Sequence, residues 1–464
     1  EFRRVLFRSR LSLPRVIQFG TAMATLVAGS AAQATDFYKA NNTSSLNVSA
    51  SWENLAGVAF VDPTKPTNTS ATSDTDIWTW DARVLAANTS PLGNDLRVKT
   101  IRIQNPGGLA TIDGVTNNRS ITVVSGGGID MSAATQDLTI SNLATASNVG
   151  LRLSSSGGNM AINIATGRTL TLNSKIAAAS NSTGTTSTVN FTGPGTMICN
   201  ADMQANRLNI ASGEVQLNLS TGSGRPGNAA TAYTNVNGGR LIVNNTAGSA
   251  TGLGPVNVKD TATLTGQGIM TGLVTVESGG TIIPKENAIG SLTAGSLTLA
   301  AGSNIKWEGV DPLNSDLVAV TGANGLTING GTLNLYNVGT ATPFSGTGTY
   351  NIFSFSGIAP NTSSLSVAES SKIDGQSYIF GVTIGTPSYV TLQIGADTRP
   401  KASWNVDADG TWSTGTNWTG GVSPNASTTI ATLGGALGTP ITAPRTVTLT
   451  GPSTVGTLNI DSAQ

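Results

Sequence analysis

Short runs in which apolar and polar residues alternate recur along the chain from about residue 95 onward. Typical runs are Leu138–Ile140, Leu170–Leu172, Leu208–Ile210, Leu297–Leu299 and Leu333–Leu335. An alternation of period two sends neighbouring side chains to opposite faces of a strand, so each run predicts a short strand with two inward residues and one outward residue. No segment after residue 35 has a convincing helical period, so the sequence predicts an all-β protein.

Clusters of glycine and asparagine separate these runs and supply the positive φ values that tight bends require. Their irregular spacing is compatible with coils of roughly 15–26 residues, which predicts a parallel β-solenoid of about 15 coils. In such a solenoid Leu, Ile and Val stack inside, and outward Thr, Asn and Ser form hydrogen-bonded ladders. An array of immunoglobulin-like sandwiches is the main alternative, but it favours longer strands and regular hairpin signals, which are scarce here.

Composition narrows the range of functions. The 464 residues include 25 basic and 25 acidic side chains, no His and one Cys. The lack of His excludes a Ser-His-Asp or Cys-His nucleophile and a His-bearing zinc site. The low, balanced charge offers no electrostatic footprint for nucleic acid or anionic lipid. Cys199 cannot form a disulfide within the chain, and we expect it to be a small buried apolar residue.

The first 34 residues are not expected to belong to the folded protein. Residues 1–9 resemble a translated sequencing-adapter tail, so we interpret them as an artefact of sequence assembly. Residues 10–34 combine Arg10 and Arg15, a short apolar run and the small-residue site Ala32–Ala34, which is the pattern of a secretory signal peptide. The apolar run is too short to span a bilayer. A buried helix is the alternative, but we expect export.

Two Trp-rich segments indicate an internal repeat. Trp52 and Trp418 lie 366 residues apart, and the strand patterns at Val98 and Val455 lie 357 residues apart. The sequence thus predicts a Trp-rich opening that caps a first unit, the β-helix of that unit and the truncated start of a second unit. Their predicted bounds are 35–120, 121–398 and 399–464. We expect the native protein to extend beyond this chain.

The middle of the chain carries a family resemblance. Residues 237–258 (NGGRLIVNNTAGSATGLGPVNV) lead into residues 262–269 (ATLTGQGI) and then residues 276–284 (VESGGTIIP). This pattern resembles the autotransporter-associated β-strand repeat of bacterial autotransporter passengers and of surface proteins with a PEP-CTERM sorting tail. The match covers roughly residues 205–360. It departs at Lys285-Glu286, where Gly usually follows the Pro, which suggests a different turn.

The resemblance implies a right-handed, single-stranded parallel β-helix that is structural or adhesive and has no catalytic residues. It implies a secreted protein, extracellular or on the outer-membrane surface of a Gram-negative-type bacterium. The expected partner is a host or neighbouring-cell surface, through an unidentified polysaccharide or protein ligand, and not a nucleic acid. Membrane attachment is expected only through a C-terminal barrel or sorting tail that this sequence does not include.

The tryptophans of the two openings are the candidate binding residues. They are Trp52, Trp78, Trp80, Trp404, Trp412 and Trp418. Exposed Trp side chains near Asn and Asp can stack on sugar rings, so these residues are candidates for carbohydrate binding. In the alternative interpretation, which we favour, they seal the first coil of each unit, whose open edge would otherwise recruit another chain.

Two acidic clusters have the composition of a metal or acid/base site. Asp407 and Asp409, beside a glycine, resemble the start of a calcium loop, but the third acidic position and the bidentate Glu are missing. Glu308, Asp311 and Asp316 surround a proline and would suit calcium or acid/base chemistry. The family resemblance places Asp316 in a recurring strand-entry turn. We therefore favour a structural role for both clusters.

A polysaccharide-cleaving enzyme is the main catalytic alternative, because pectinases and polysaccharide lyases share the β-helix. Such chemistry needs several carboxylates with Arg or Lys on one face of successive coils. Apart from the residue at their edge, the coils of residues 138–219 contain only two carboxylates, Asp202 and Glu214. Gly126–Gly128 precedes no helix, so it predicts a bend rather than a phosphate cradle. We expect no enzyme, no cofactor and no metal, and the alternative function is a carbohydrate-binding or polysaccharide-cleaving β-helix protein.

Overall fold

The computed structural model describes most of the chain after residue 35. The described residues are 36–58, 75–115, 119–144, 150–154, 158–177, 187–218, 222–223, 232–434 and 439–461. They form strands and short 3-10 helices but no α-helix, which confirms the all-β prediction. No helix among them has the length and apolar character needed to cross a bilayer. The predicted artefact and signal peptide, residues 1–9 and 10–34, lie outside the described residues.

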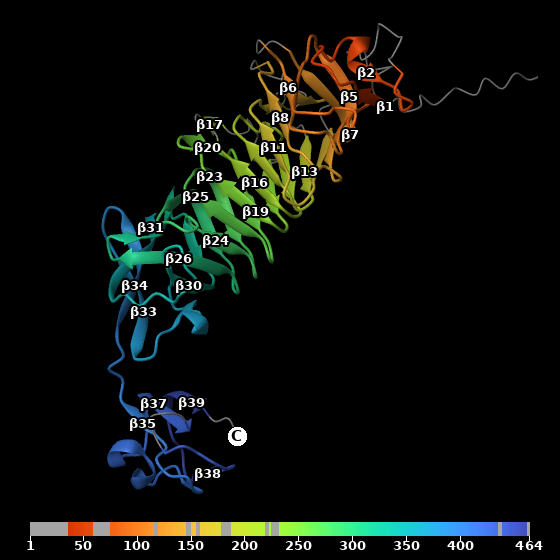
Figure 1. Cartoon of the computed structure of the whole chain (residues 1–464). Coiled ribbons are helices and arrows are strands. Elements are labelled where there is room, and N and C mark those ends of the chain that lie inside the picture. The colour runs from red at the N-terminus through yellow and green to blue at the C-terminus, as the bar shows by residue number, and fades with distance from the viewer. Residues whose placement is uncertain are drawn as a thin grey trace, which may run out of the picture.

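Parallel strands stack along one axis and form the elongated body of the molecule (Figure 1). The first sheet contains β1 (Asp36–Lys39), β2 (Trp52–Glu53), β3 (Ile77–Trp80), β5 (Leu96–Ile103), β7 (Ile121–Met131), β9 (Leu151–Leu153), β10 (Asn159–Ile164), β12 (Ile176–Ala177), β13 (Thr188–Thr192), β15 (Arg207–Ile210), β18 (Tyr233–Val236), β21 (Val256–Val258), β23 (Ile269–Val276), β25 (Ser291–Leu299), β28 (Leu317–Ala323), β29 (Leu326–Ile328), β31 (Gly348–Ser356), β33 (Gln376–Thr383) and β34 (Ser388–Ala396).

The second sheet contains β4 (Asn88–Pro91), β6 (Ala110–Asp113), β8 (Leu138–Ser141), β11 (Thr169–Leu172), β14 (Thr196–Cys199), β16 (Glu214–Leu217), β19 (Arg240–Val243), β22 (Thr263–Gly266), β24 (Thr281–Ile283), β26 (Asn304–Asp311), β30 (Gly331–Asn337) and β32 (Leu365–Val367), with β27 (Asn314–Ser315) on β26. The remaining elements of this body are the short pair β17 (Gly222–Ser223) and β20 (Gly248–Ser249), η1 (Ser49–Ser51) and η2 (Glu369–Ser371).

The first sheet bends at a corner, so three faces surround one core. The first part of β5 pairs with Ile121–Val123 of β7, and the second part pairs with Gly128–Asp130 after a register shift. Beyond this corner β9 continues the first face and β10 continues the second face. The second sheet supplies the third face, and its strands also pair in parallel. This arrangement confirms the predicted parallel β-solenoid.

The coils differ in length because loops of different size leave the corners. Met197 pairs with Val215, 18 residues along the chain, whereas Leu138 pairs with Leu170, 32 residues along. The third face runs through twelve successive strands among the described residues, fewer than the expected 15 coils. Parallel pairing begins at β1, before the predicted start at residue 121, because the Trp-rich opening already forms coils.

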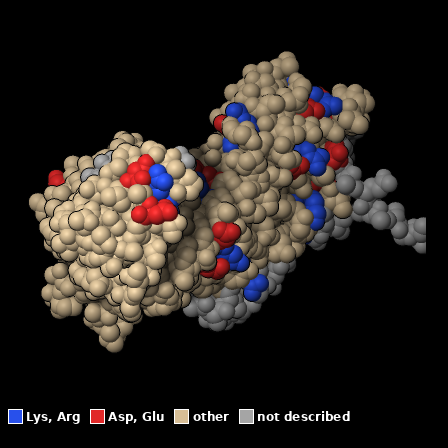
Figure 2. All heavy atoms as spheres, turned by 90° about the horizontal axis from the view of Figure 1, so that it is seen from below, with Lys and Arg blue, Asp and Glu red and all other residues tan. Residues whose placement is uncertain are grey.

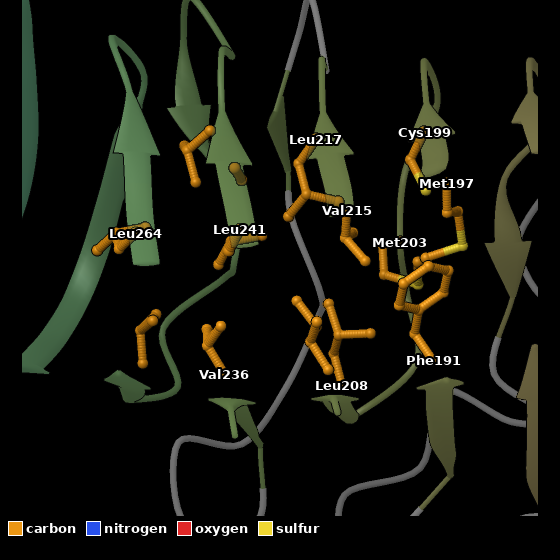
Figure 3. Packing of buried hydrophobic residues seen from close by; sticks show 14 of the residues in the cluster. Phe191, Met197, Cys199, Met203, Leu208, Val215, Leu217, Val236, Leu241 and Leu264 are labelled. Carbon is orange, nitrogen blue, oxygen red and sulfur yellow. The ribbon is translucent and has the colours of Figure 1, made fainter. Parts of the chain in front are cut away.

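Stacked apolar side chains fill the interior. In Figure 3, side chains such as Phe191, Leu208, Val215 and Leu241 point from opposite strands toward one another. Each is fully buried, and burying one such side chain stabilises the fold by roughly 1.5–3 kcal/mol. Cys199 is a free, buried thiol, as predicted, and burial raises its pKa to about 12.

The two ends of the solenoid are closed by antiparallel structure. At the N-terminal end, β2 pairs antiparallel with β1, which pairs in parallel with β3. At the other end β34 pairs antiparallel with both β31 and β33. At these two places on the first sheet, an antiparallel strand covers the edge of the last parallel strand.

A second, smaller unit follows residue 399, close to the predicted boundary (Figure 1). Its elements are β35 (Lys401–Ser403), β36 (Gly410–Thr411), η3 (Gly415–Asn417), η4 (Thr419–Gly421), β37 (Ala426–Gly434), β38 (Val447–Thr448) and β39 (Val455–Asp461). β35, β37 and β39 pair in parallel, as β1, β3 and β5 do. In both units a 3-10 helix precedes a Trp, and that Trp donates its indole N–H to the carbonyl six residues earlier, in Leu46 and in Trp412. The two Trp-rich segments therefore share their local structure as well as their sequence pattern.

Candidate functional site

The six candidate tryptophans lie inside the molecule. Trp52, Trp78, Trp80, Trp404 and Trp418 are at most 1% exposed, and Trp412 is 6% exposed. A sugar stacks on the open face of an aromatic ring, so burial contradicts the exposure that carbohydrate stacking requires.

These tryptophans instead form the cores of the two openings. Trp52 packs against Phe37 with ring centroids 5.9 Å apart, and against Trp78 and Trp80 at 5.6 and 5.8 Å. In the second unit Trp418 packs against Trp404 and Trp412. Edge-to-face aromatic packing adds about 0.5–1.5 kcal/mol per pair to the free energy of burial. This geometry favours the cap interpretation.

The acidic cluster around residue 312 separates into two buried carboxylates and one half-buried carboxylate at a hairpin tip. Glu308 and Asp316 have no exposed surface, whereas Asp311 lies at the tip of the β26–β27 hairpin. Asp311 accepts the backbone N–H groups of Leu313 and Asn314 and so holds the tip. The three carboxylates therefore do not converge on one ligand.

The buried pair fixes two neighbouring segments to the solenoid. Asp316 accepts the N–H of Gly290 at 2.9 Å and that of Glu308 at 3.0 Å. Glu308 accepts the N–H groups of Asn287 and Gly339 at 3.4 and 3.3 Å, and it pairs with Lys306 at 3.3 Å. Burial raises the pKa of Asp316 to about 7, although its two N–H donors oppose the shift.

The Asp407–Asp409 turn is occupied by protein groups. Asp407 accepts hydrogen bonds from the backbone and hydroxyl of Thr442 and from Arg445, and Asp409 accepts the N–H of Thr446. The bonds from Arg445 and Thr442 lower the pKa of Asp407 to about 2. This geometry suits the predicted structural turn. No group of three or more acidic or Cys side chains in the described residues could hold a metal ion.

On the face seen in Figure 2, most charged side chains lie in small groups of opposite sign among uncharged residues. Arg240 lies 3.5 Å from Glu214 and also binds Glu286, which pairs with Lys306 at 3.9 Å. The bond from Arg240 lowers the pKa of Glu286. In the turns that precede Ile176 and Met203, burial raises the pKa of Asp202, and the nearby Lys175 only partly opposes this shift. Each of these three carboxylates, Glu214, Glu286 and Asp202, interacts with a basic side chain.

Outward asparagines form two hydrogen-bonded ladders. The sequence predicts ladders of this type, formed by outward polar residues. On the second face Asn209 donates to Asn190 at 2.9 Å, Asn235 to Asn209 at 3.4 Å and Asn257 to Asn235 at 2.9 Å. At the ends of the third-face strands, Asn200 donates to Asn173, Asn218 to Asn200 and Asn244 to Asn218, at 2.9, 3.2 and 3.1 Å. These amides bind one another, so the ladders are structural.

Two of the hollows on the described surface contain charged side chains from successive strands or from both units. One of about 540 Å³ lies where the solenoid meets the second unit, and its lining includes two ion pairs, Lys372 with Glu369 and Arg399 with Asp397. The other, of about 370 Å³, lies on the second face beside the corner at Gly126–Gly128 and is lined by Arg102, Asp130 and other polar residues. The bend that the sequence predicts at Gly126–Gly128 thus forms part of the rim of this second hollow.

Sequence reasoning did not identify this second hollow. Its residues come from three successive coils, residues 100–102, 126–132 and 161–163, and only the strand register brings them together. A signal was present, because the outward position that carries Asn in four later coils is Gly128 and then Ala161 in the earlier ones. This signal can be recognised only when it is known which residues of successive coils are paired with one another.

No protein-family model matches the chain. No curated protein matches it either. The resemblance to autotransporter-associated repeats therefore rests on the residues of this sequence alone.

Proposed function

We propose that this chain is a secreted or cell-surface β-helical protein of a Gram-negative-type bacterium, with a structural or adhesive and non-catalytic role. The observation that carries the proposal is the long parallel stack, whose outward polar groups are used mainly to bind the next coil. A solenoid of this kind is a rigid spacer that carries loops along its length. The repeat-like segments of residues 205–360 support the same role through their resemblance to autotransporter passengers.

The electrostatics of the described residues support a scaffold over a polysaccharide-cleaving enzyme. Hydrolysis or lyase chemistry needs convergent carboxylates or a base within reach of the substrate. The buried carboxylates Glu308 and Asp316 instead accept backbone N–H groups, and Glu214 lies beside Arg240. These contacts hold the chain in place.

Immunogold labelling of the source bacterium tests the surface location. Antibodies raised against the purified chain should label intact cells as strongly as permeabilised cells. A cytoplasmic protein labelled with its own antibody is the control and should appear only after permeabilisation. Labelling of this chain only after permeabilisation would contradict the proposal.

Adhesion is tested separately with beads that carry the purified protein. We expect coated beads to cluster with neighbouring bacterial cells or host cells and albumin-coated beads to remain dispersed. Equal behaviour of the two kinds of bead would rule out an adhesive role and leave the structural one.

A further inference from the structure

We propose that the hollow on the second face is a binding site for one residue of a neutral glycan. The hollow measures about 370 Å³ and is formed by β5, β7 and β10, whose strands are paired in register. Its strand β5 pairs with β3, but Trp78 and Trp80 of β3 are buried, so the hollow is a different site from the stacking surface that the sequence predicts. The proposal does not depend on where the protein is located.

The hollow exists because one outward column of the second face loses its side chains. This column contains Thr100, Gly128, Ala161 and Asn190 in successive coils. An added Cβ at Gly128 would lie 1.7 Å from the carbonyl oxygen of Ala161, so this position accepts only glycine. The floor is therefore backbone and one methyl group, where a ligand can approach closely.

The neighbouring outward column keeps long polar side chains and forms a wall. Arg102, Asp130 and Asn163 follow one another in register, about 4.8 Å apart along the axis. That spacing is close to the separation of hydroxyl groups on opposite sides of a hexopyranose ring. Three planar polar groups at this interval match the way proteins bind sugar hydroxyls.

These groups keep hydrogen-bonding capacity for a ligand. Arg102 donates through Nε to Asp130 at 3.1 Å, and Asp130 also accepts from the backbone and hydroxyl of Ser132. Within the described part of the chain, the terminal amino groups of Arg102 and the side-chain amide of Asn163 form no hydrogen bond. The asparagines of the ladder, by contrast, bind one another. The wall thus offers several donors and one carboxamide acceptor.

The opposite rim is held in place by the corner. Gly126 has a φ of 75°, and Lys99 donates from Nζ to the carbonyl of Ser125 at 2.9 Å. Ser125 in turn accepts from the N–H of Asn159 and donates its own N–H to Ser154. The rim is therefore preorganised, which lowers the cost of binding.

The charges and the strand pairing define the class of ligand. Arg102 and Asp130 neutralise each other, so the hollow does not favour a strongly anionic or cationic ligand. β7 and β10 are paired on both sides, so no free backbone edge is available for an added peptide strand. A ligand rich in hydroxyl groups satisfies both donors and acceptors. Without an aromatic platform, we expect a dissociation constant of about 1 mM for one sugar unit.

Saturation-transfer NMR with the purified chain tests the proposal. The probes are cellobiose, maltose, lactose and N,N′-diacetylchitobiose, with digalacturonic acid as the charged comparison. We expect saturable binding of at least one neutral disaccharide and at least about tenfold weaker binding of the acid, a difference of about 1.4 kcal/mol. No neutral probe binding up to about 10 mM, or equal binding of the acid, would overturn the proposal.

Two variants locate the site. Ala161→Asn extends the asparagine ladder by one rung and fills the hollow, so it should keep the fold and weaken disaccharide binding about tenfold. Thr275→Asn extends the same ladder at its other end, next to Asn257, and is the matched control that should bind like the unchanged protein. Equal binding by Ala161→Asn and the unchanged protein would place the sugar elsewhere and contradict the assignment.

Asn163→Ala leaves the hollow open but removes its amide. We expect a severalfold loss of affinity for the disaccharide with an unchanged unfolding temperature. An unchanged affinity would contradict the assignment of Asn163 to the binding site. Immunogold and bead results test the proposed surface function independently, so failure of either proposal does not imply failure of the other.

Discussion

Asp316 and Asp311 lie five residues apart and have opposite surroundings. Asp316 is enclosed beside Trp307, which donates its indole N–H to the backbone carbonyl of Asp316 at 2.8 Å, whereas Asp311 is only half-buried, at a hairpin tip. Both accept two backbone N–H groups. The bonds to Asp316 are more costly to lose than those to Asp311. A buried N–H group that loses its acceptor cannot bind water instead.

We therefore predict that Asp316→Ala destabilises the solenoid by about 3 kcal/mol, since the N–H groups of Gly290 and Glu308 lose their acceptor. Asp311→Ala, on the same hairpin, should cost less than about 1 kcal/mol because water replaces the carboxylate. Urea unfolding measures both values. Equal losses for the two variants would mean that burial does not decide the role of Asp316.

The burial of Asp316 also makes the stability of the solenoid depend on pH. The pKa of Asp316 is raised to about 7 from its ordinary value of 3.8, so the folded state takes up its proton before the unfolded state does. The contribution of Asp316 should make the solenoid more stable as the pH falls from about 7 to about 4. Asp316→Asn should remove this part of the slope. Unfolding midpoints between pH 4 and pH 8 compare the two proteins, and an identical slope would contradict the assignment.

At the scale of the strand, the asparagine ladders link coils that are already paired through their backbones. Asn200 is an inner rung that donates to Asn173 and accepts from Asn218, whereas Asn173 is an end rung that accepts only from Asn200 among the described residues. The alternation of apolar and polar residues predicts that such amides point outward. It does not predict that they stand in line, because loops of different length separate the coils.

An inner rung should matter more than an end rung. We predict that Asn200→Ala costs about 1–2 kcal/mol because two side-chain hydrogen bonds are lost, and that Asn173→Ala costs about half as much. Chemical denaturation of the two variants measures the difference. A loss for Asn173→Ala as large as that for Asn200→Ala would show that the ladder bonds do not add.

At the scale of the whole molecule, the described residues form two separate hydrophobic cores that repeat one opening motif. Trp52 belongs to the core of the solenoid, and Trp418 belongs to the core of the second unit. The same indole hydrogen bond and the same 3-10 turn recur in both. Because the cores share no residue, each unit should unfold by itself.

We predict two transitions in scanning calorimetry. Trp418→Ala should lower the smaller transition and leave the larger one unchanged, and Trp52→Ala should do the reverse, each with a loss of about 3–5 kcal/mol from the unit concerned. The two variants are controls for each other. A single transition that both variants shift would show that the units unfold together.

The sequence by itself determined the all-β class, the parallel coiling, the two openings and the outward asparagines. These follow from local alternation and turn residues, which act over a few positions. The tertiary structure decided the burial of the tryptophans, which face inward only because β1, β2 and β3 pack around them. It also decided the hollow at Gly128 and Ala161, because the alignment of coils depends on loop lengths that no local pattern records.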